Sequence, residues 1–371
     1  MKTKMQIPLS QPFIGEEEIE AVLKVMRSSR LSIGPQLEAF EQAFAELFNV
    51  PYAVACNSGT SGLHMAIRAF GIKDGDEVIT SPFSFIASAN CILFERAKPV
   101  FVDVEQESFN MDPALIEAAI TPRTKAILPV HVFGQSADMA AIMDIAKRHN
   151  LRVIEDACEA PLALHNGQMA GTFGDCSVYG FYPNKQMTTG EGGMVITADE
   201  EVYKMCKSLR NQGRGDSLQW LSHARLGYNY RINELTAAIG TVQTRKLPAI
   251  IEQRKQVANW YLEALADTPG IILPKEKEGN VHSWFVFGVR VDAARRDTLI
   301  EQLNAAGVQS KAYFFPCIHL QEFYMRDFGY KMGDFPKAEQ LSNEMLILPF
   351  FTQMTHEQVM YVVETFKELL G

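Results

Sequence analysis

The sequence contains few of the residue patterns that mark secreted, metal-binding or membrane proteins. Its six cysteines are spread over 371 residues without a C-x-x-C pair, so we expect reduced thiols rather than a disulfide framework. The eight histidines form no H-x-x-H or H-E-x-x-H pair, and we expect no metal site. No apolar run approaches the roughly 20 residues that cross a bilayer, and no apolar segment precedes the acidic residues 16–18 as a signal peptide requires. These absences predict a soluble, cytoplasmic protein that does not bind a membrane.

Basic residues are also too few to balance the acidic ones. Lys and Arg total 35 against 44 Asp and Glu, which gives a formal net charge of −9. This balance argues against binding to nucleic acid or to an anionic membrane surface. Apolar residues make up 47% of the chain and charged residues 21%, which excludes a disordered chain, a collagen and a coiled coil. The length suits about two domains of roughly 150 residues each.

Short apolar runs alternate with helical patterns over the first half of the chain. The runs at residues 52–56, 77–80, 100–104, 126–132 and 152–155 are separated by helical spacings at residues 60–70, 85–94, 113–120 and 138–150. This alternation is typical of a parallel sheet with helices on both faces. We predict an α/β fold with a large domain over residues 1–249, N-terminal helices included, and a smaller C-terminal α+β domain over residues 250–371. Ligands of such sheets bind at the carboxyl ends of the strands.

The first candidate ligand site is the turn Asn-Ser-Gly-Thr-Ser-Gly at residues 57–62, which follows a predicted strand and begins a predicted helix. The unpaired backbone N–H groups and the positive end of the helix favour an anion such as phosphate, and the Thr60 hydroxyl adds a donor. The alternative is a turn that only caps the helix.

Asp156 and Lys185 are the next candidates. Glu155 and Asp156 end a predicted buried strand, where an unpaired charge is costly, so a carboxylate there needs a cation such as a protonated cofactor ring. The alternative is that Asp156 caps the next helix. Lys185 lies between aromatic and small residues. Burial lowers the pKa of a lysine and makes its neutral amine available for Schiff-base formation, although most lysines are surface residues. The order of the three motifs favours the chemical interpretation.

This ordered set resembles the DegT/DnrJ/EryC1/StrS family of pyridoxal-phosphate-dependent nucleotide-sugar aminotransferases, from about Ile7 to the C-terminus. The matching motifs are Ser58–Thr60, Glu155–Glu159, Phe181–Lys185, Gly190–Gly193 and Gly227–Arg231. The lysine motif with its G-E-G-G tail is highly specific, whereas the turn alone is not. The resemblance implies the aspartate-aminotransferase-like fold (PLP fold type I), pyridoxal 5'-phosphate as cofactor and a homodimer with shared active sites.

The resemblance also implies roles for the residues that hold the cofactor. Lys185 would anchor pyridoxal phosphate covalently and move protons, and Asp156 would pair with the pyridine nitrogen. The cofactor phosphate would bind at Gly59 and Thr60. Two further residues are candidates for reaching this phosphate, Asn229 from the partner subunit or Arg231 as its alternative.

Phe85 and Glu159 match positions near the cofactor ring. Phe85 would stack on the ring and Glu159 would lie near its 3-hydroxyl, while the plain alternatives are a core aromatic and a solvated carboxylate. Two departures stand out. Many members carry a neutral Gln or His where this chain has Glu159, and many carry a phosphate-binding Ser where it has Gly180. Water or Ser177 would have to bind the phosphate in place of that serine.

Three more positions match segments that approach the sugar substrate in the family. They are His319, for which a satisfied structural histidine is the alternative, the weaker Tyr313, and the turn Gly34–Pro35, which otherwise only breaks a helix.

The expected reaction is transamination of a nucleotide-linked keto-sugar, a 4-keto-6-deoxy sugar by resemblance, with glutamate as amino donor for amino-sugar biosynthesis. The alternatives are a 3-keto-sugar aminotransferase and a pyridoxal-phosphate-binding regulator. A dehydratase branch of the family has histidine in place of the lysine, so Lys185 favours the aminotransferase. A dinucleotide-dependent oxidoreductase is excluded because no G-x-G-x-x-G follows the first strand.

Overall fold

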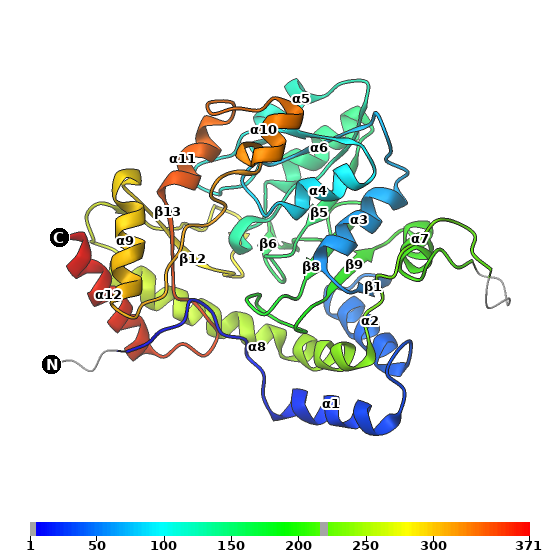
Figure 1. Ribbon diagram of the computed structural model, residues 1–371, viewed down its shortest axis with the longest axis horizontal. Helices are drawn as coiled ribbons and strands as arrows, with labels where there is room; N and C mark the ends of the chain where they lie inside the picture. The colour runs from blue at the N-terminus through cyan, green and yellow to red at the C-terminus, as the bar shows by residue number, and fades with distance from the viewer. Residues whose placement is uncertain (1–4, 216–221) are drawn as a thin grey trace.

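A seven-stranded sheet forms the centre of the computed structural model, which describes residues 5–215 and 222–371 (Figure 1). Its strands lie in the order β1, β9, β8, β5, β4, β2, β3. Their bounds are β1 Tyr52–Cys56, β2 Glu77–Thr80, β3 Lys98–Phe101, β4 Thr124–Ile127, β5 Arg152–Asp156, β8 Cys176–Gly180 and β9 Gly193–Thr197. Neighbours are parallel except at β9, which is antiparallel to both β1 and β8. The predicted, mostly parallel sheet is confirmed.

Both faces of this sheet are covered by helices. They are α2 Pro35–Phe48, α3 Gly59–Ala69, α4 Ala87–Phe94, α5 Ile116–Ala119, α6 Met139–His149, α7 Glu200–Arg210 and α8 Glu234–Leu265, with short 3₁₀ turns η1 Pro113–Leu115 and η2 Val132–Gly134. Helix α1 Glu16–Ser28 packs against α8 instead. Alternate residues of a strand point to opposite faces. Val54 accordingly joins the core that contains residues of α3 and α7, whereas Ala53 joins the core that contains residues of α2 and α8.

The C-terminal part builds a smaller antiparallel sheet. Its elements are β10 Ile271–Ile272, β12 Phe287–Val291, β13 Met345–Leu348, α9 Ala293–Ala305, η3 Ile318–Leu320, α10 Glu322–Phe328, α11 Pro336–Glu344 and α12 His356–Leu370. A core around Phe287 and Leu346 joins this sheet to its helices, and Ile7 near the N-terminus packs into the same core and pairs with Val308. A third small sheet pairs β11 Asn280–Val281 with β6 Leu164–His165 and β7 Gln168–Met169.

Helix α8 runs beside both parts of the molecule (Figure 1). Its first half contributes Ala237 and Leu247 to the core shared with α2, and its second half contributes Val257 and Tyr261 to the core of the smaller sheet. Pro248 lies inside the helix without ending it. The predicted boundary between residues 249 and 250 therefore lies within one continuous helix, and the division into two domains stays a prediction.

The apolar run Trp284–Val291 predicts a single strand from end to end, but the corresponding strand β12 starts later. It begins at Phe287, because Trp284 has a left-handed backbone conformation with φ of 52° that interrupts an extended chain. Strand β13 and helices α10 and α11 were not predicted.

Candidate active site

The predicted anion turn lies at the carboxyl end of β1, where α3 begins at Gly59. The Ser58 hydroxyl caps the helix by accepting a hydrogen bond at 3.1 Å from a backbone N–H of its first turn. A β-carbon on Gly59 would lie 3.0 Å from Cys158 Sγ and 3.4 Å from the Gly180 α-carbon. The helix N-terminus, which includes Thr60, therefore packs directly against the ends of β5 and β8.

Asp156 ends β5 and is buried, with 5% of its surface exposed. Its Oδ2 accepts a hydrogen bond from the Ser88 hydroxyl at 2.7 Å, and its Oδ1 accepts one from the Cys158 N–H at 3.2 Å. Among the described residues it forms no salt bridge. A buried carboxylate held by neutral donors alone is electrostatically incomplete, and a cationic ligand would complete it.

The neighbouring Glu155 shows the opposite situation. Its carboxylate is hydrogen bonded to His131 Nε2 at 2.8 Å and accepts three backbone N–H groups, from Gly171, Phe173 and Gly174, at 2.7 to 2.8 Å. Both of its carboxylate oxygens accept hydrogen bonds within the protein. Glu155 therefore fixes the loop that precedes β8 and is not available to a ligand.

Lys185 lies in the loop after β8, with 15% of its side chain exposed. Its Nζ is 3.3 Å from Glu159 Oε1 and 3.9 Å from the centre of the Phe285 ring. Glu159 Oε2 accepts a hydrogen bond from the Phe133 N–H at 2.9 Å. The lysine is therefore not a surface residue of a hairpin, and Glu159 is not a solvated carboxylate.

Burial raises the pKa of the Glu159 carboxyl group, and the nearby Asp156 charge adds to the rise, while Lys185 and the Phe133 N–H oppose it. Burial likewise raises the pKa of the Cys158 thiol well above its usual range, again with Asp156 adding to the rise and Lys185 opposing it. These mutual influences show that Asp156, Glu159 and Lys185 share one buried environment.

Phe85 is 63% exposed and lies in the loop between β2 and α4. The same loop carries Ser84, whose hydroxyl lies 2.9 Å from that of Ser88, the residue bonded to Asp156. Phe85 is therefore not a core aromatic, and its loop is joined to the Asp156 environment. Stacking on a cofactor ring stays a prediction.

Asn229 and Arg231 lie beside the anion turn of their own chain. The Tyr230 carbonyl accepts a hydrogen bond from the Asn57 N–H at 2.9 Å, and Arg231 Nη1 donates to Asn211 Oδ1 at 3.0 Å. The Asn229 side chain is exposed. Its predicted contact with the phosphate of a partner subunit is not tested by a single chain and stays a prediction.

Ser177, the predicted substitute for a phosphate-binding serine at position 180, is a fully buried residue of β8. Its hydroxyl donates a hydrogen bond to the Gly171 carbonyl at 2.7 Å. The hydroxyl hydrogen of Ser177 is therefore already used in a bond to the loop before β8, and it cannot be donated to a phosphate at the same time. Ser177 does not replace the serine of the other family members.

Of the two residues predicted to meet the sugar, Tyr313 lies near Lys185. Its ring centre is 5.5 Å from that of Phe133 and 6.2 Å from that of Phe285. Burial raises the pKa of Tyr313, the Glu159 charge adds to the rise, and the side-chain amide of Asn184 opposes it.

His319 lies elsewhere, in the core beneath α11. It is fully buried, its Nε2 is hydrogen bonded to Glu339 Oε1 at 3.0 Å, and its ring packs edge-on against Phe335. Burial lowers the pKa of His319, although Glu339 opposes the shift. The bond to Glu339 matches a structural histidine, although its buried Nδ1 has no hydrogen-bond partner among the described residues, and no contact between His319 and Lys185 occurs in that part of the chain.

The Gly34–Pro35 turn forms the start of α2. The Glu234 carboxylate accepts the backbone N–H groups of Gly34, Gln36 and Leu37 at 2.8 to 3.1 Å. A β-carbon on Gly34 would lie 2.6 Å from Glu234 Oε2. The turn therefore has a clear structural role in joining α2 to α8.

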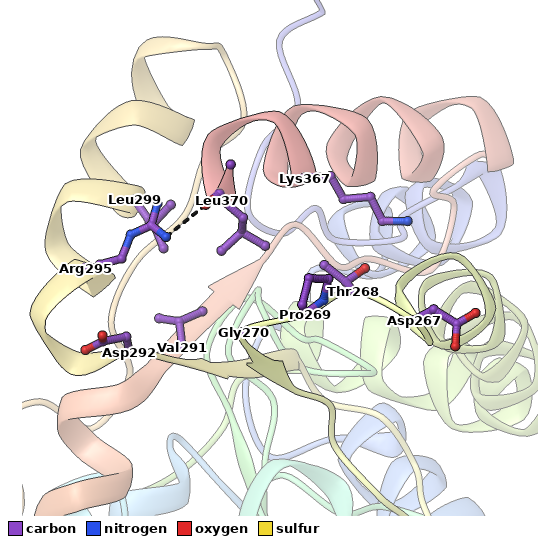
Figure 2. Close-up of a pocket in the computed structure, with 11 residues that line it drawn as sticks. Asp267, Thr268, Pro269, Gly270, Val291, Asp292, Arg295, Leu299, Lys367 and Leu370 are labelled. Carbon is purple, nitrogen blue, oxygen red and sulfur yellow. Dashed lines mark hydrogen bonds between the residues drawn. The ribbon is translucent and has the colours of Figure 1, made fainter.

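A cavity of about 390 Å³ lies away from these residues, between the start of α9 and the end of α12 (Figure 2). Arg295 crosses its rim and donates to the Leu370 carbonyl at 2.9 Å. The cavity contains none of the predicted site residues. Over residues 5–215 and 222–371, no group of three His, Cys, Asp or Glu side chains could hold a metal ion, and no helix could span a membrane.

Comparison with known proteins settles the family. The model of the DegT/DnrJ/EryC1/StrS aminotransferase family matches residues 12–367. The chain belongs to this family. A GDP-perosamine synthase from Caulobacter vibrioides is 37% identical over 370 residues, 98% of each chain. A UDP-N-acetyl-3-dehydro-alpha-D-glucosamine 3-aminotransferase from Acidithiobacillus ferrooxidans is 39% identical over 358 residues, 96% of this chain and 95% of the relative.

Solved structures of DegT-family aminotransferases share the whole fold. Spr1654 from Streptococcus pneumoniae, in its PLP-form, aligns with a TM-score of 0.93 at 27% identity over 98% of both chains. The protein is therefore a nucleotide-sugar aminotransferase of amino-sugar biosynthesis, in a family that depends on pyridoxal phosphate.

The site residues fit pyridoxal phosphate. Buried Asp156 has no cationic partner among the described residues, which suits a protonated ring nitrogen. Asn184 Oδ1 beside the lysine is buried and has no hydrogen-bond partner in the described chain. The N-terminus of α3 offers a phosphate its positive end. A ligand with a phosphate at one end and a cationic ring at the other would complete these groups.

Three residues of the site were missed by sequence reasoning. Ser88, Phe133 and Phe285 contact Asp156, Glu159 and Lys185 respectively. Ser88 carried a signal, because it lies just past a strand end, in the same segment as Phe85. Phe133 and Phe285 carried none, because neither lies in a motif.

Proposed function

We propose that the chain transfers the amino group of glutamate to the keto group of a nucleotide-linked 4-keto-6-deoxy sugar, with pyridoxal phosphate held by Lys185. The observation that carries the proposal is the buried grouping of Lys185, Glu159 and the cation-free Asp156 beside the N-terminus of α3. The relatives support a keto-sugar acceptor, since both are named for nucleotide-linked sugar products or substrates.

Pyridoxal phosphate, when bound, supplies a ring that withdraws electrons from the carbon that bears the amino group. Asp156 keeps the ring nitrogen protonated by pairing with it, and Ser88 holds that carboxylate in place. Lys185 Nζ anchors the cofactor. When it is not attached to the cofactor, Nζ would act as the base that takes a proton from the amino donor and as the acid that returns one. Gly59 and Thr60 hold the phosphate at the start of α3.

We expect Glu159 to donate a hydrogen bond to the ring oxygen when its carboxyl group carries a proton. Burial raises its pKa, so the carboxyl group holds its proton at a higher pH than an ordinary glutamate does. The protonated group can then donate in the position where many family members use Gln or His. Its second oxygen stays fixed by the Phe133 N–H.

Borohydride trapping tests the covalent anchor. The protein is incubated with pyridoxal phosphate and reduced, and its peptides are mapped by mass spectrometry. We expect the cofactor mass on the peptide that contains Lys185, no such mass in Lys185→Ala, and a normal result in the control Lys246→Ala, which removes another partly buried lysine bonded to a carboxylate. A cofactor mass on a different lysine would contradict the assignment.

The substrate is tested with a panel of nucleotide-linked keto-sugars offered to glutamate-treated protein, with the product's aminated position determined. Amination at C4 of a 6-deoxy sugar supports the proposal. Amination at C3 supports the second candidate, a 3-keto-sugar aminotransferase, which the relative from A. ferrooxidans favours.

The exposed Asn229 supports a homodimer in which each chain completes the other's phosphate site. Mixing inactive Lys185→Ala with inactive Asn229→Ala and allowing the chains to exchange should restore about a quarter of wild-type activity, since each hybrid dimer contains one intact site. Failure of the mixture to regain activity, with exchange shown by mass spectrometry, would exclude the shared site.

A further inference from the structure

Lys185 belongs to a closed circuit of contacts in which the proposed chemistry gives no role to Phe285. Its Nζ lies 3.3 Å from Glu159 Oε1, and Glu159 Oε2 accepts the Phe133 N–H at 2.9 Å. The Phe133 carbonyl accepts the Phe285 N–H at 2.9 Å, and the Phe285 ring centre lies 3.9 Å from Nζ. The circuit joins the lysine loop, the segment after β5, the segment after β4 and the segment before β12.

Two backbone conformations in this circuit are unusual. Phe133 has φ of 58° and Trp284, which precedes Phe285, has φ of 52°. Residues other than glycine adopt this left-handed region at a cost, and such conformations cluster at functional sites. Here the left-handed turn at Phe133 lets its N–H reach Glu159 while its carbonyl reaches Phe285.

Arg254 of α8 holds the Phe285 segment from the other side. It is 2% exposed, and its guanidinium donates to the Trp284 and Phe285 carbonyls at 2.7 Å each and to Thr352 Oγ1 at 3.3 Å. In the described chain it forms no salt bridge, and burial lowers its pKa to about 9. A buried cation without an acidic partner is energetically costly. We therefore infer that the two hydrogen bonds from the guanidinium to the Trp284 and Phe285 carbonyls do more than fill space.

We propose that Phe285 is a positioning residue whose ring face receives the Lys185 amine in its proton-carrying form, while the lysine is detached from the cofactor, and that Arg254 fixes the ring in that place. This proposal rests on the proposed function. The proton leaves the donor carbon and forms an N–H bond on Nζ, whose positive charge then faces the negative face of the ring and the Glu159 carboxyl. The same N–H bond breaks when the proton is delivered.

The test follows how readily the cofactor-free protein attaches pyridoxal phosphate. Attachment needs the neutral form of the lysine amine. The attachment rate is followed by visible absorbance, and its half-maximal pH falls when a contact that stabilises the ammonium form is lost. In Phe285→Leu this pH should fall by about one unit, because a desolvated cation–π contact of this kind contributes at about that level. Among the described residues, the titratable groups coupled to Lys185 are Glu159 and Cys158, and Asp156 and Tyr313 are coupled to Glu159 in turn; all four are unchanged in the variant.

Three further proteins make the result specific. Phe366→Leu removes an equally buried ring from α12 and should leave the pH of attachment unchanged. Arg254→Lys keeps the positive charge but loses the planar guanidinium that donates to both carbonyls. It should lower the pH of half-maximal attachment, by less than Phe285→Leu does. Fluorinated phenylalanine at position 285 keeps the shape of the ring but weakens the negative potential of its face. It should also lower the pH of half-maximal attachment, and it provides the test if Phe285→Leu fails to fold.

A second readout separates positioning from binding. With glutamate deuterated at its α-carbon, Phe285→Leu should show a larger isotope effect on kcat than the wild type and an unchanged KM for glutamate. If the wild type attaches the cofactor at Lys185 but all variants share its pH of attachment, the inference is overturned and the proposed function stands. An equal shift in Phe366→Leu also overturns it. Absence of attachment in the wild type overturns both.

Discussion

Replacing Gly180 with serine tests why this chain lacks the residue that many relatives carry there. A β-carbon at position 180 would lie 3.3 Å from Cys158 Sγ and 3.4 Å from Cys158 Cβ, and the serine hydroxyl would need further room. Overpacking of this kind costs about 1–3 kcal/mol, and we expect Gly180→Ser to lower the free energy of unfolding by about 1 to 2 kcal/mol. Cys158→Ala alone removes one sulfur from the site and should cost about 1 kcal/mol.

The losses in free energy of unfolding from the two substitutions should not add, because Cys158→Ala makes the space that the serine at position 180 requires. We expect the double variant to lose about 1 kcal/mol less than the sum of the single losses, as residues in contact do. The assay is urea unfolding of all four proteins of the cycle, followed by tryptophan fluorescence and by circular dichroism. Additive losses would show that contact with Cys158 is not what keeps position 180 a glycine.

Three other changes give further predictions. Ser88→Ala should weaken pyridoxal phosphate binding about ten-fold, measured by fluorescence quenching, because Asp156 loses a charge-assisted hydrogen bond of 2.7 Å; unchanged affinity would exclude the role of Ser88. The raised pKa of Glu159 gives the wild type stability that is full below the ordinary carboxyl pKa and is lost as pH rises through the folded value. Glu159→Gln should therefore be more stable than the wild type at neutral pH in urea unfolding and lose that advantage in acid, and the reverse order would contradict the shift. Burial lowers the pKa of His282 from 6.5 to about 3, so its contribution to stability is full above 6.5 and is lost as pH falls toward 3. His282→Asn, which keeps an acceptor for the Trp284 N–H, should make the acid-side fall in unfolding free energy shallower by about 1.4 kcal/mol per pH unit, and parallel curves would contradict it.

The large sheet was predictable because its parallel strands are buried on both faces. Such strands are continuous apolar runs, and residues 52–56 and 152–155 match β1 and β5 closely. The insertion of β9 between β1 and β8 was not predictable, because it depends on pairing with residues 52–56, far away in sequence. β13 was missed because an apolar run of four residues, Met345–Leu348, does not distinguish a strand from part of a helix.

The site was predictable where function lies in a local motif. Asp156 ends a strand, Gly59 begins a helix and Lys185 precedes a glycine-rich turn, so each could be recognised as a candidate from its neighbouring residues. Phe285 gave no such signal, since its contact with Lys185 arises only when the C-terminal part folds against the large sheet. His319 shows the converse, because resemblance placed it near substrate whereas its bond to Glu339 places it in a core.

Helix α8 has a consequence for how the protein comes apart. Leu247 and Tyr261 of this one helix pack into two separate hydrophobic cores. Unfolding of either core therefore removes packing contacts from the other. Heat should therefore disrupt both together, and calorimetry should record one endotherm whose van't Hoff and calorimetric enthalpies agree. Two resolved endotherms would mean that α8 loses its helical continuity at Pro248, so that the two cores unfold independently.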